Sequence, residues 1–104
     1  MKTEKKKITE VISELRKCGF TVINNNYNKG FGKQMAGFVD YVIYNFNYVH
    51  FVEVKIGYDK LSEAQKDTKA KLESIAKQSA HIYYHIIDSE AGAKSMVDFI
   101  ASKK

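Results

Sequence analysis

The sequence contains no proline, one arginine and one cysteine among its 104 residues. Because Cys18 has no second cysteine to pair with, an internal disulfide is excluded, and the composition fits a reducing compartment. No apolar run approaches the roughly 20 residues that span a bilayer, and the first residues, MKTEKKK, lack the apolar region of a signal peptide. The sequence therefore predicts a cytoplasmic protein that does not enter a membrane.

Lysine, by contrast, is abundant. Lys and Arg total 17 against 12 Asp and Glu, which gives a formal net charge of +5. A basic balance favours polyanionic partners, nucleic acid first, through attraction to phosphates and counterion release. Many small basic domains bind no polyanion, so the charge alone assigns no function.

The length bounds the architecture. A chain of 104 residues suffices for one domain, and such a domain buries about two-thirds of the surface that its unfolded chain exposes. No internal repeat and no linker divides it, so residues 1–104 are expected to form a single domain. A core of this size can hold few charged side chains that lack a purpose.

Apolar spacing and turn residues predict an α/β fold of order αβββαβα, in which helices pack against a mixed sheet. Thr3 as N-cap and Gly19 as stop bound the first helix. The three residues Asn-Phe-Asn between the second and third strands favour an antiparallel hairpin, and the amide- and glycine-rich residues 24–37 favour an exposed loop. The expected elements are a helix over 3–18, strands over 20–24, 38–44 and 48–55, a helix over 62–78, a strand over 81–87, and a last helix capped by Asp88 or Ser89.

Charged side chains interrupt the predicted hairpin. Asp40 shares its strand parity with apolar neighbours, and Glu53 and Lys55 lie two residues apart on one face of the next strand. Two carboxylates that converge across adjacent strands would repel each other, and a divalent cation such as Mg²⁺ or Mn²⁺ removes that repulsion. An ion pair on the sheet surface is the simpler alternative, but it leaves the additional acid unexplained.

The pattern Asp40-x12-Glu53-Val54-Lys55 resembles the PD-(D/E)xK nuclease superfamily, and the order of motifs resembles its virus-type replication-repair branch, the VRR-NUC domains. The matching segments cover roughly residues 3 to 90: TEKKKITEVISELRKCGF, GFVD, FVEVK, KLSEAQ and HIYYHII. The residue before the aspartate, often proline in these families, is Val39 here. Since that residue is not a ligand, the departure leaves the chemistry untouched. The resemblance implies a restriction-endonuclease-like core.

The resemblance also implies a function. The implied function is that of an endonuclease that depends on Mg²⁺ or Mn²⁺ and hydrolyses DNA. Its implied substrates are branched or Holliday-junction DNA, in recombination, repair or replication. Asp40, Glu53 and the backbone carbonyl of Val54 would bind the metal, and Lys55 and Gln65 would complete the catalytic set. A homodimer and a bacterial or phage origin are implied as well. The alternative is a non-catalytic nucleic-acid-binding module that uses the same fold.

Two residues have a structural and a functional interpretation each. Glu4 lies on the apolar side of its predicted helix, opposite to Glu10. It is either an additional metal ligand, as the resemblance implies, or a first-turn acid that interacts with the helix dipole. Gln65 either supports catalysis near Lys55 or closes a capping box with Ser62, and the two roles are compatible.

Candidates for DNA contact lie outside the acidic pair. The long loop interleaves Tyr27 and Phe31 with Lys29 and Lys33. Aromatic side chains there could stack on bases while the lysines contact phosphates, or the loop is only a polar connection. Lys60, near the start of the second long helix, could reach a phosphate.

The remaining chemistry-bearing residues are expected to be structural. His50, His81 and His85 show no metal-ligand spacing, and Cys18 has no base adjacent in the sequence. The aromatic residues of the predicted sheet exceed what so small a core can hide, so some could line a self-association surface.

Overall fold

The computed structural model describes residues 3–25, 37–57 and 60–104. They form a small α+β domain with a four-stranded mixed sheet and three α-helices, and the elements follow the predicted order αβββαβα. The elements are α1 (Glu4–Ser13), the 3₁₀ helix η1 (Glu14–Cys18), β1 (Thr21–Asn24), β2 (Tyr41–Tyr44), β3 (Val49–Val54), α2 (Glu63–Gln78), β4 (Ile82–Ile87) and α3 (Glu90–Ser102).

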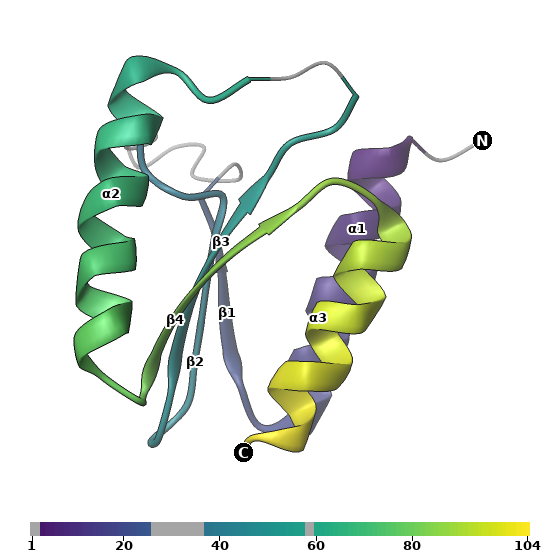
Figure 1. Cartoon of the computed structure of the whole chain (residues 1–104). Helices are drawn as coiled ribbons and strands as arrows, with labels where there is room; N and C mark the ends of the chain where they lie inside the picture. The colour runs from purple at the N-terminus through teal and green to yellow at the C-terminus, as the bar shows by residue number, and fades with distance from the viewer. Residues whose placement is uncertain (1–2, 26–36, 58–59) are drawn as a thin grey trace.

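The strands lie in the order β1-β2-β3-β4. β1 pairs antiparallel with β2, and β2 pairs antiparallel with β3 through the predicted hairpin. β4 pairs parallel with β3, which requires the chain to cross from one end of the sheet to the other. α2 makes that crossing, so the end of β3 and the start of α2 lie at the same end of the molecule (Figure 1).

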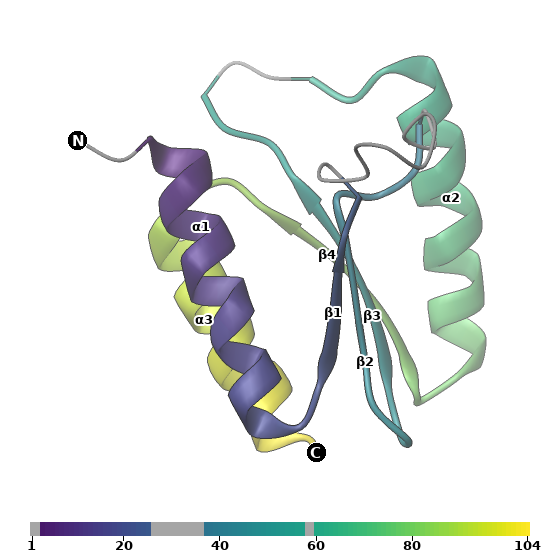
Figure 2. The same cartoon turned by 180° about the vertical axis from the view of Figure 1, so that it is seen from behind.

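Two helices cover one face of the sheet and one helix covers the other (Figures 1 and 2). α1 and α3 lie against each other, and the main apolar core lies between them and the sheet. We call the opposite side the α2 face. The core consists of Ile8, Ile12, Leu15, Phe20, Val22, Tyr41, Ile43, Val52, Ile87, Ala93, Met96 and Ile100.

The first helix is shorter than predicted. Thr3 caps it by accepting a hydrogen bond from the Lys6 N–H, but the α-helix ends at Ser13 and continues as the 3₁₀ helix η1 to Cys18. Gly19 then adopts the left-handed conformation with φ of 91°. Tightening of a last turn is a common way to satisfy terminal carbonyl groups, and spacing of apolar residues does not distinguish the two helix types.

The second strand begins later than predicted, at Tyr41 and not at residue 38. Asp40 therefore precedes the regular strand, although its N–H donates to the Val52 carbonyl and its carbonyl accepts from Asn25. The chain enters this strand from Gly37, whose φ of 78° is accessible mainly to glycine. This turn delays the regular pairing by a few residues.

The later elements match their predicted ends closely. Ser62 caps α2, and Ser89, one of the two predicted candidates, caps α3 by accepting from the Gly92 N–H. The last strand begins at Ile82, one residue later than expected. None of the helices in the described ranges has the length and apolar content of a membrane-spanning segment.

Candidate active site

The predicted acidic residues meet where β2 begins, β3 ends and α2 begins. Glu53 is the penultimate residue of β3, and Lys55 follows the strand. In a strand, residues two apart point to the same face, and both side chains contact Gln65 in the first turn of α2. Both therefore lie on the α2 face.

Asp40 and Glu53 are direct neighbours. The Glu53 side chain is only 1% exposed, and it is hydrogen-bonded to the carboxyl group of Asp40. Burial, this hydrogen bond and the negative charge of Asp40 raise the pKa of Glu53 to about 8, against the weaker opposing effect of Lys55. In the absence of a cation, the pair therefore keeps a proton on Glu53 at neutral pH.

Gln65 links the site to the start of α2. Its Nε2 donates to Glu53 Oε1 at 3.2 Å, and its Oε1 accepts from Lys55 Nζ at 2.9 Å. The same Oε1 accepts from the Ser62 N–H at 2.9 Å, while Ser62 Oγ accepts from the Gln65 N–H at 3.1 Å. Gln65 thus closes the predicted capping box, and it also holds the acid and the lysine together.

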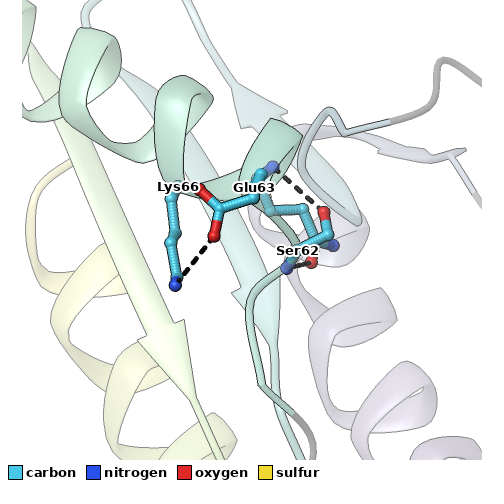
Figure 3. A network of polar contacts seen from close by, with 4 residues as sticks. Ser62, Glu63 and Lys66 are labelled. Carbon is cyan, nitrogen blue, oxygen red and sulfur yellow. Dashed lines mark hydrogen bonds and ion pairs between the residues drawn. The ribbon is translucent and has the colours of Figure 1, made fainter.

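The neighbouring residue Glu63 points elsewhere. It pairs with Lys66 at 3.3 Å on the outer side of α2, and Figure 3 shows this contact beside the capping interactions of Ser62. The first turn of α2 therefore separates a solvent-facing acid from the glutamine that faces the site.

The backbone of β3 adds an oxygen to the site. The Lys55 N–H donates to the Ile87 carbonyl of β4, whereas the Val54 N–H donates to Oδ2 of Asp40 at 2.8 Å. Because the N–H and C=O groups of one strand residue point to the same side of the strand, the Val54 carbonyl is directed toward the side on which Asp40 lies.

This set of oxygens fits a divalent metal. Two carboxyl groups in contact would repel each other if both were ionised, and either a proton or a cation can remove that repulsion. In the described ranges no three His, Cys, Asp or Glu side chains form a metal-binding group. A cation here would accordingly be held by Asp40, Glu53 and the Val54 carbonyl, with waters or substrate oxygens completing its shell, as is usual for Mg²⁺.

Glu4 has a different contact from the one that the resemblance implied. Its Oε1 accepts a hydrogen bond from the Glu90 N–H at 2.7 Å. This carboxylate thus interacts with the N-terminus of α3, where the helix dipole favours a negative charge. This contact agrees with the interpretation of Glu4 as an acid that interacts with a helix dipole, but the helix is α3 and not α1, to which Glu4 belongs.

The predicted DNA-contacting residues are only partly described. Tyr27, Lys29, Phe31 and Lys33 lie outside the described residues. Lys60 is exposed and lies two residues before the N-cap of α2.

Gly37 is a positioning residue that the sequence reasoning left without a role. A Cβ atom at this position would lie 2.6 Å from the Cβ of Ala64 in the first turn of α2. Only glycine allows the chain before Asp40 to pass so close to the helix that carries Gln65. The glycine in the segment GFVD was visible, but its partner is 27 positions away and only the fold reveals it.

His50 of β3 and His85 of β4 lie on the opposite face of the sheet. His50 is fully buried, and its Nδ1 lies 3.0 Å from His85 Nε2, with Phe99 of α3 packed edge-on against both rings. Burial lowers the pKa of both histidines. For His50, the positive charges of His85 and Lys103 lower it further, to about 4. The pair is separate from the acidic site.

Comparison with protein-family models, with curated proteins and with solved structures gives no match for this chain. The functional assignment therefore depends on the geometry of the site itself.

Proposed function

We propose that this protein is a metal-dependent endonuclease that hydrolyses phosphodiester bonds in DNA, with a site of the PD-(D/E)xK type on a restriction-endonuclease-like core. The observation that supports this most strongly is the contact of Asp40 with the buried carboxyl group of Glu53, near the end of β3. Gln65 links Glu53 to Lys55. A surface ion pair requires neither the burial nor the second acid.

The residues present can hold Mg²⁺ or Mn²⁺. Bound there, the ion would compensate charge that develops on a phosphate and would lower the pKa of a bound water molecule. Asp40, Glu53 and the Val54 carbonyl are the proposed ligands. Glu53 must lose its proton to act as a ligand, so binding is expected to release a proton and to strengthen as the pH rises.

Lys55 and Gln65 have supporting roles in this proposal. The ammonium group of Lys55 is fixed by Gln65 Oε1 at 2.9 Å. It places a positive charge beside the two acids, where it can orient a water molecule and offset negative charge on a phosphate. Gln65 in turn is fixed by Ser62, so the rigid start of α2 positions both groups.

DNA is the proposed substrate because the chain has a net charge of +5 and because the site resembles those of DNA-cleaving VRR-NUC domains. Branched or Holliday-junction DNA, handled in recombination, repair or replication, is the substrate class that this resemblance favours. Lys60, which is exposed near the start of α2, is the proposed phosphate contact. The homodimer, the cytoplasmic location and the bacterial or phage origin belong to the same proposal.

The test is cleavage of linear, flapped and four-way DNA by the wild type and two matched variants, with Mg²⁺, with Mn²⁺ and with chelator. Glu53→Gln should reduce metal-dependent cleavage by at least about 1,000-fold, because it removes a ligand from the site. Glu63→Gln, ten residues away on the outer side of α2, should cleave like the wild type.

Cleavage by Glu53→Gln at the wild-type rate would contradict the proposal. Absence of cleavage by the wild type on all substrates, together with salt-sensitive DNA binding and no measurable metal binding, would instead select the non-catalytic binding module.

A further inference from the structure

A polar cavity of about 330 Å³ lies beside the edge strand β1, on the side of the sheet that α1 and α3 cover. Its walls come from α1, η1 and the first two strands: Thr9, Ser13, Arg16, Val22, Asn24 and Tyr41. The chain passes from α1 through η1 directly into β1 (Figure 2), so these elements are close in the sequence as well. A cavity of this volume is at the lower end of those that hold small molecules in proteins.

α1 and η1 present three polar side chains to the cavity. Thr9, Ser13 and Arg16 are four and three positions apart, which places them on one helix face. Arg16 is exposed, whereas Tyr41 at the other wall is only 4% exposed and contacts the Thr9 hydroxyl. The cavity therefore runs from an exposed guanidinium to a buried hydroxyl group.

Arg16 is fixed in place without a charged partner. Its terminal nitrogens donate to Ser13 Oγ at 3.3 Å and to the Val22 carbonyl at 2.9 Å. Among the residues that the structure describes, no carboxylate pairs with Arg16 and no acid lines the cavity. Of the five N–H groups of a guanidinium, two donate in these contacts, which leaves three for a ligand. A fixed guanidinium with free donors is suited to an anionic group.

Two hydroxyl groups place acceptors next to Arg16. The Thr9 hydroxyl donates to the Lys5 carbonyl at 3.0 Å, and the Ser13 hydroxyl donates to the Thr9 carbonyl at 2.8 Å. Because a hydroxyl group has one proton, the 2.6 Å hydrogen bond between Thr9 and Tyr41 is donated by Tyr41.

Each of the two hydroxyl oxygens therefore keeps one acceptor site. Thr9 Oγ1 accepts from Tyr41 and Ser13 Oγ accepts from Arg16, and within the described ranges neither oxygen accepts a second hydrogen bond. A hydroxyl oxygen has two lone pairs. The cavity thus offers donors to an anion at its mouth and acceptors to O–H groups along its wall.

We propose that this cavity binds a sugar phosphate, that is, a phosphate ester whose carbon skeleton carries hydroxyl groups. Arg16 receives the phosphate group, and Thr9 and Ser13 accept hydrogen bonds from the sugar hydroxyl groups. A phosphate monoester is favoured over a carboxylate because its three terminal oxygens match the three remaining N–H groups of Arg16.

The cavity is separate from the acidic site. Tyr41 belongs to the core beneath α1 and α3, whereas the preceding residue, Asp40, contacts Glu53 on the α2 face. The inference therefore goes beyond the proposed nuclease function and does not depend on it, because binding is measured without metal and without cleavage.

The first test is an NMR titration of the isotope-labelled protein with ribose 5-phosphate, in a buffer free of phosphate. Methyl phosphate is the matched ligand, since it has the same anionic group and no hydroxyl group. Ribose 5-phosphate should shift the amide signals of residues around Ser13 and should bind at least about 10-fold more tightly than methyl phosphate, because further hydrogen bonds form. Equal affinities, or no binding at a few millimolar, would overturn the proposal.

Two matched variants each remove one positive charge. Arg16→Ala should weaken the binding of ribose 5-phosphate by at least about 10-fold, because hydrogen bonds between charged groups are lost. Lys17→Ala should bind like the wild type, since the Lys17 side chain is 79% exposed, pairs with Glu14 and does not line the cavity. Arg16→Lys should bind nearly as weakly as Arg16→Ala, because an ammonium group lacks the planar set of donors.

Circular dichroism verifies that each variant folds. If Arg16 served only to cover the Val22 carbonyl of the edge strand, its replacement would lower stability without changing these affinities. Equal binding by Arg16→Ala and Lys17→Ala would show that only net charge matters, and the proposal would be wrong.

A last comparison tests the recognition of hydroxyl groups. Ser13→Ala should reduce the preference for ribose 5-phosphate over methyl phosphate, because one acceptor for a sugar hydroxyl is removed. A short single-stranded DNA with a 5′-phosphate should bind more weakly than ribose 5-phosphate, since it lacks most of the free hydroxyl groups. An unchanged preference in Ser13→Ala would contradict the proposal. Binding of the DNA as tight as that of ribose 5-phosphate, with the same loss in Arg16→Ala, would reassign Arg16 to a contact with a nucleic-acid phosphate.

Discussion

The chemistry of the candidate site depends on four polar side chains that are fixed by one another. Glu53 is buried against Asp40, and Gln65 joins Glu53 to Lys55 while it also caps α2. A buried polar network of this kind is stable only if its members are satisfied. Removal of one member therefore affects the orientation of the others as well as its own contacts.

Two substitutions can separate the capping role of Gln65 from its role in the site. Ser62→Ala removes the hydroxyl that accepts the Gln65 N–H and should lower the free energy of unfolding by about 1 kcal/mol, with cleavage near the wild-type rate. Gln65→Ala also releases Lys55 and Glu53, so cleavage should fall by roughly 10- to 100-fold, as is typical for groups that support metal ligands.

Urea unfolding and initial cleavage rates of the two variants provide the measurement. If Ser62→Ala reduced cleavage as strongly as Gln65→Ala at the same loss of stability, the contribution of Gln65 would be capping alone.

At the scale of elements, the site exists because the start of β2 passes close to the start of α2. The approach depends on Gly37, which faces Ala64 and has a φ of 78°. The same contact sets the distance between the segment that carries Asp40 and the helix that carries Gln65. α1 and α3 are also joined at their N-termini, through the hydrogen bond between Glu4 and the Glu90 N–H.

Gly37→Ala should therefore lower the free energy of unfolding by about 2 to 4 kcal/mol, from backbone strain and from the clash with Ala64, and it should reduce cleavage by displacing Asp40. Gly57→Ala is the control, because Gly57 has a φ of 67° but no atom within 4 Å of the added Cβ. Its free energy of unfolding should fall by only about 1 kcal/mol, from backbone strain without a clash.

The combination of Gly37→Ala with Ala64→Gly provides a second control, since it removes the 2.6 Å contact between the two Cβ atoms and leaves the backbone strain, with about 1 kcal/mol added for glycine within a helix. Urea unfolding measures all three variants. Equal destabilisation by Gly37→Ala and Gly57→Ala would show that the close approach is unimportant.

At the scale of the whole molecule, the sheet separates two groups of titratable residues whose pKa values are shifted in opposite directions. The pKa of Glu53 is raised to about 8 on the α2 face, and the pKa values of His50 and His85 are lowered on the other face. A raised acid pKa stabilises the fold at low pH, and this stability is lost as the pH rises through the folded-state pKa. A lowered histidine pKa stabilises the fold at high pH, and this stability is lost as the pH falls.

The metal-free protein should consequently lose stability as the pH rises above about 6.5. Below about pH 6.5, the histidines take up protons on unfolding, and this opposes the effect of Glu53. From pH 6.5 to 8, Glu53 contributes most among these three groups, and stability should fall by up to about 1.4 kcal/mol per pH unit. Urea unfolding at intervals of one pH unit in chelator measures this curve.

Glu53→Gln should remove the fall above pH 6.5, and its stability should decrease more steeply on the acid side, because the histidine effect is then unopposed. A variant curve that still fell between pH 6.5 and 8 would show that another group causes the loss.

Much of the fold was predictable because its signals are local. The capping box at Ser62, the hairpin at residues 45–47 and the common face of Glu53 and Lys55 each depend on a few adjacent residues. The late start of β2 was not predictable, because the segment before it makes hydrogen bonds and close contacts with distant segments. The 3₁₀ end of the first helix was not predictable, because the spacing of apolar residues does not distinguish the two helix types.

The sequence by itself determined the order of the elements and the residue types available for chemistry, since periodicity, capping and turn preferences act over a few residues. The tertiary structure decided which of those residues meet. Only the packed fold brings Glu4 to α3, stacks His50 on His85 and buries Glu53 between Asp40 and Gln65. Burial and proximity between distant segments are properties of packing, and no local pattern encodes them.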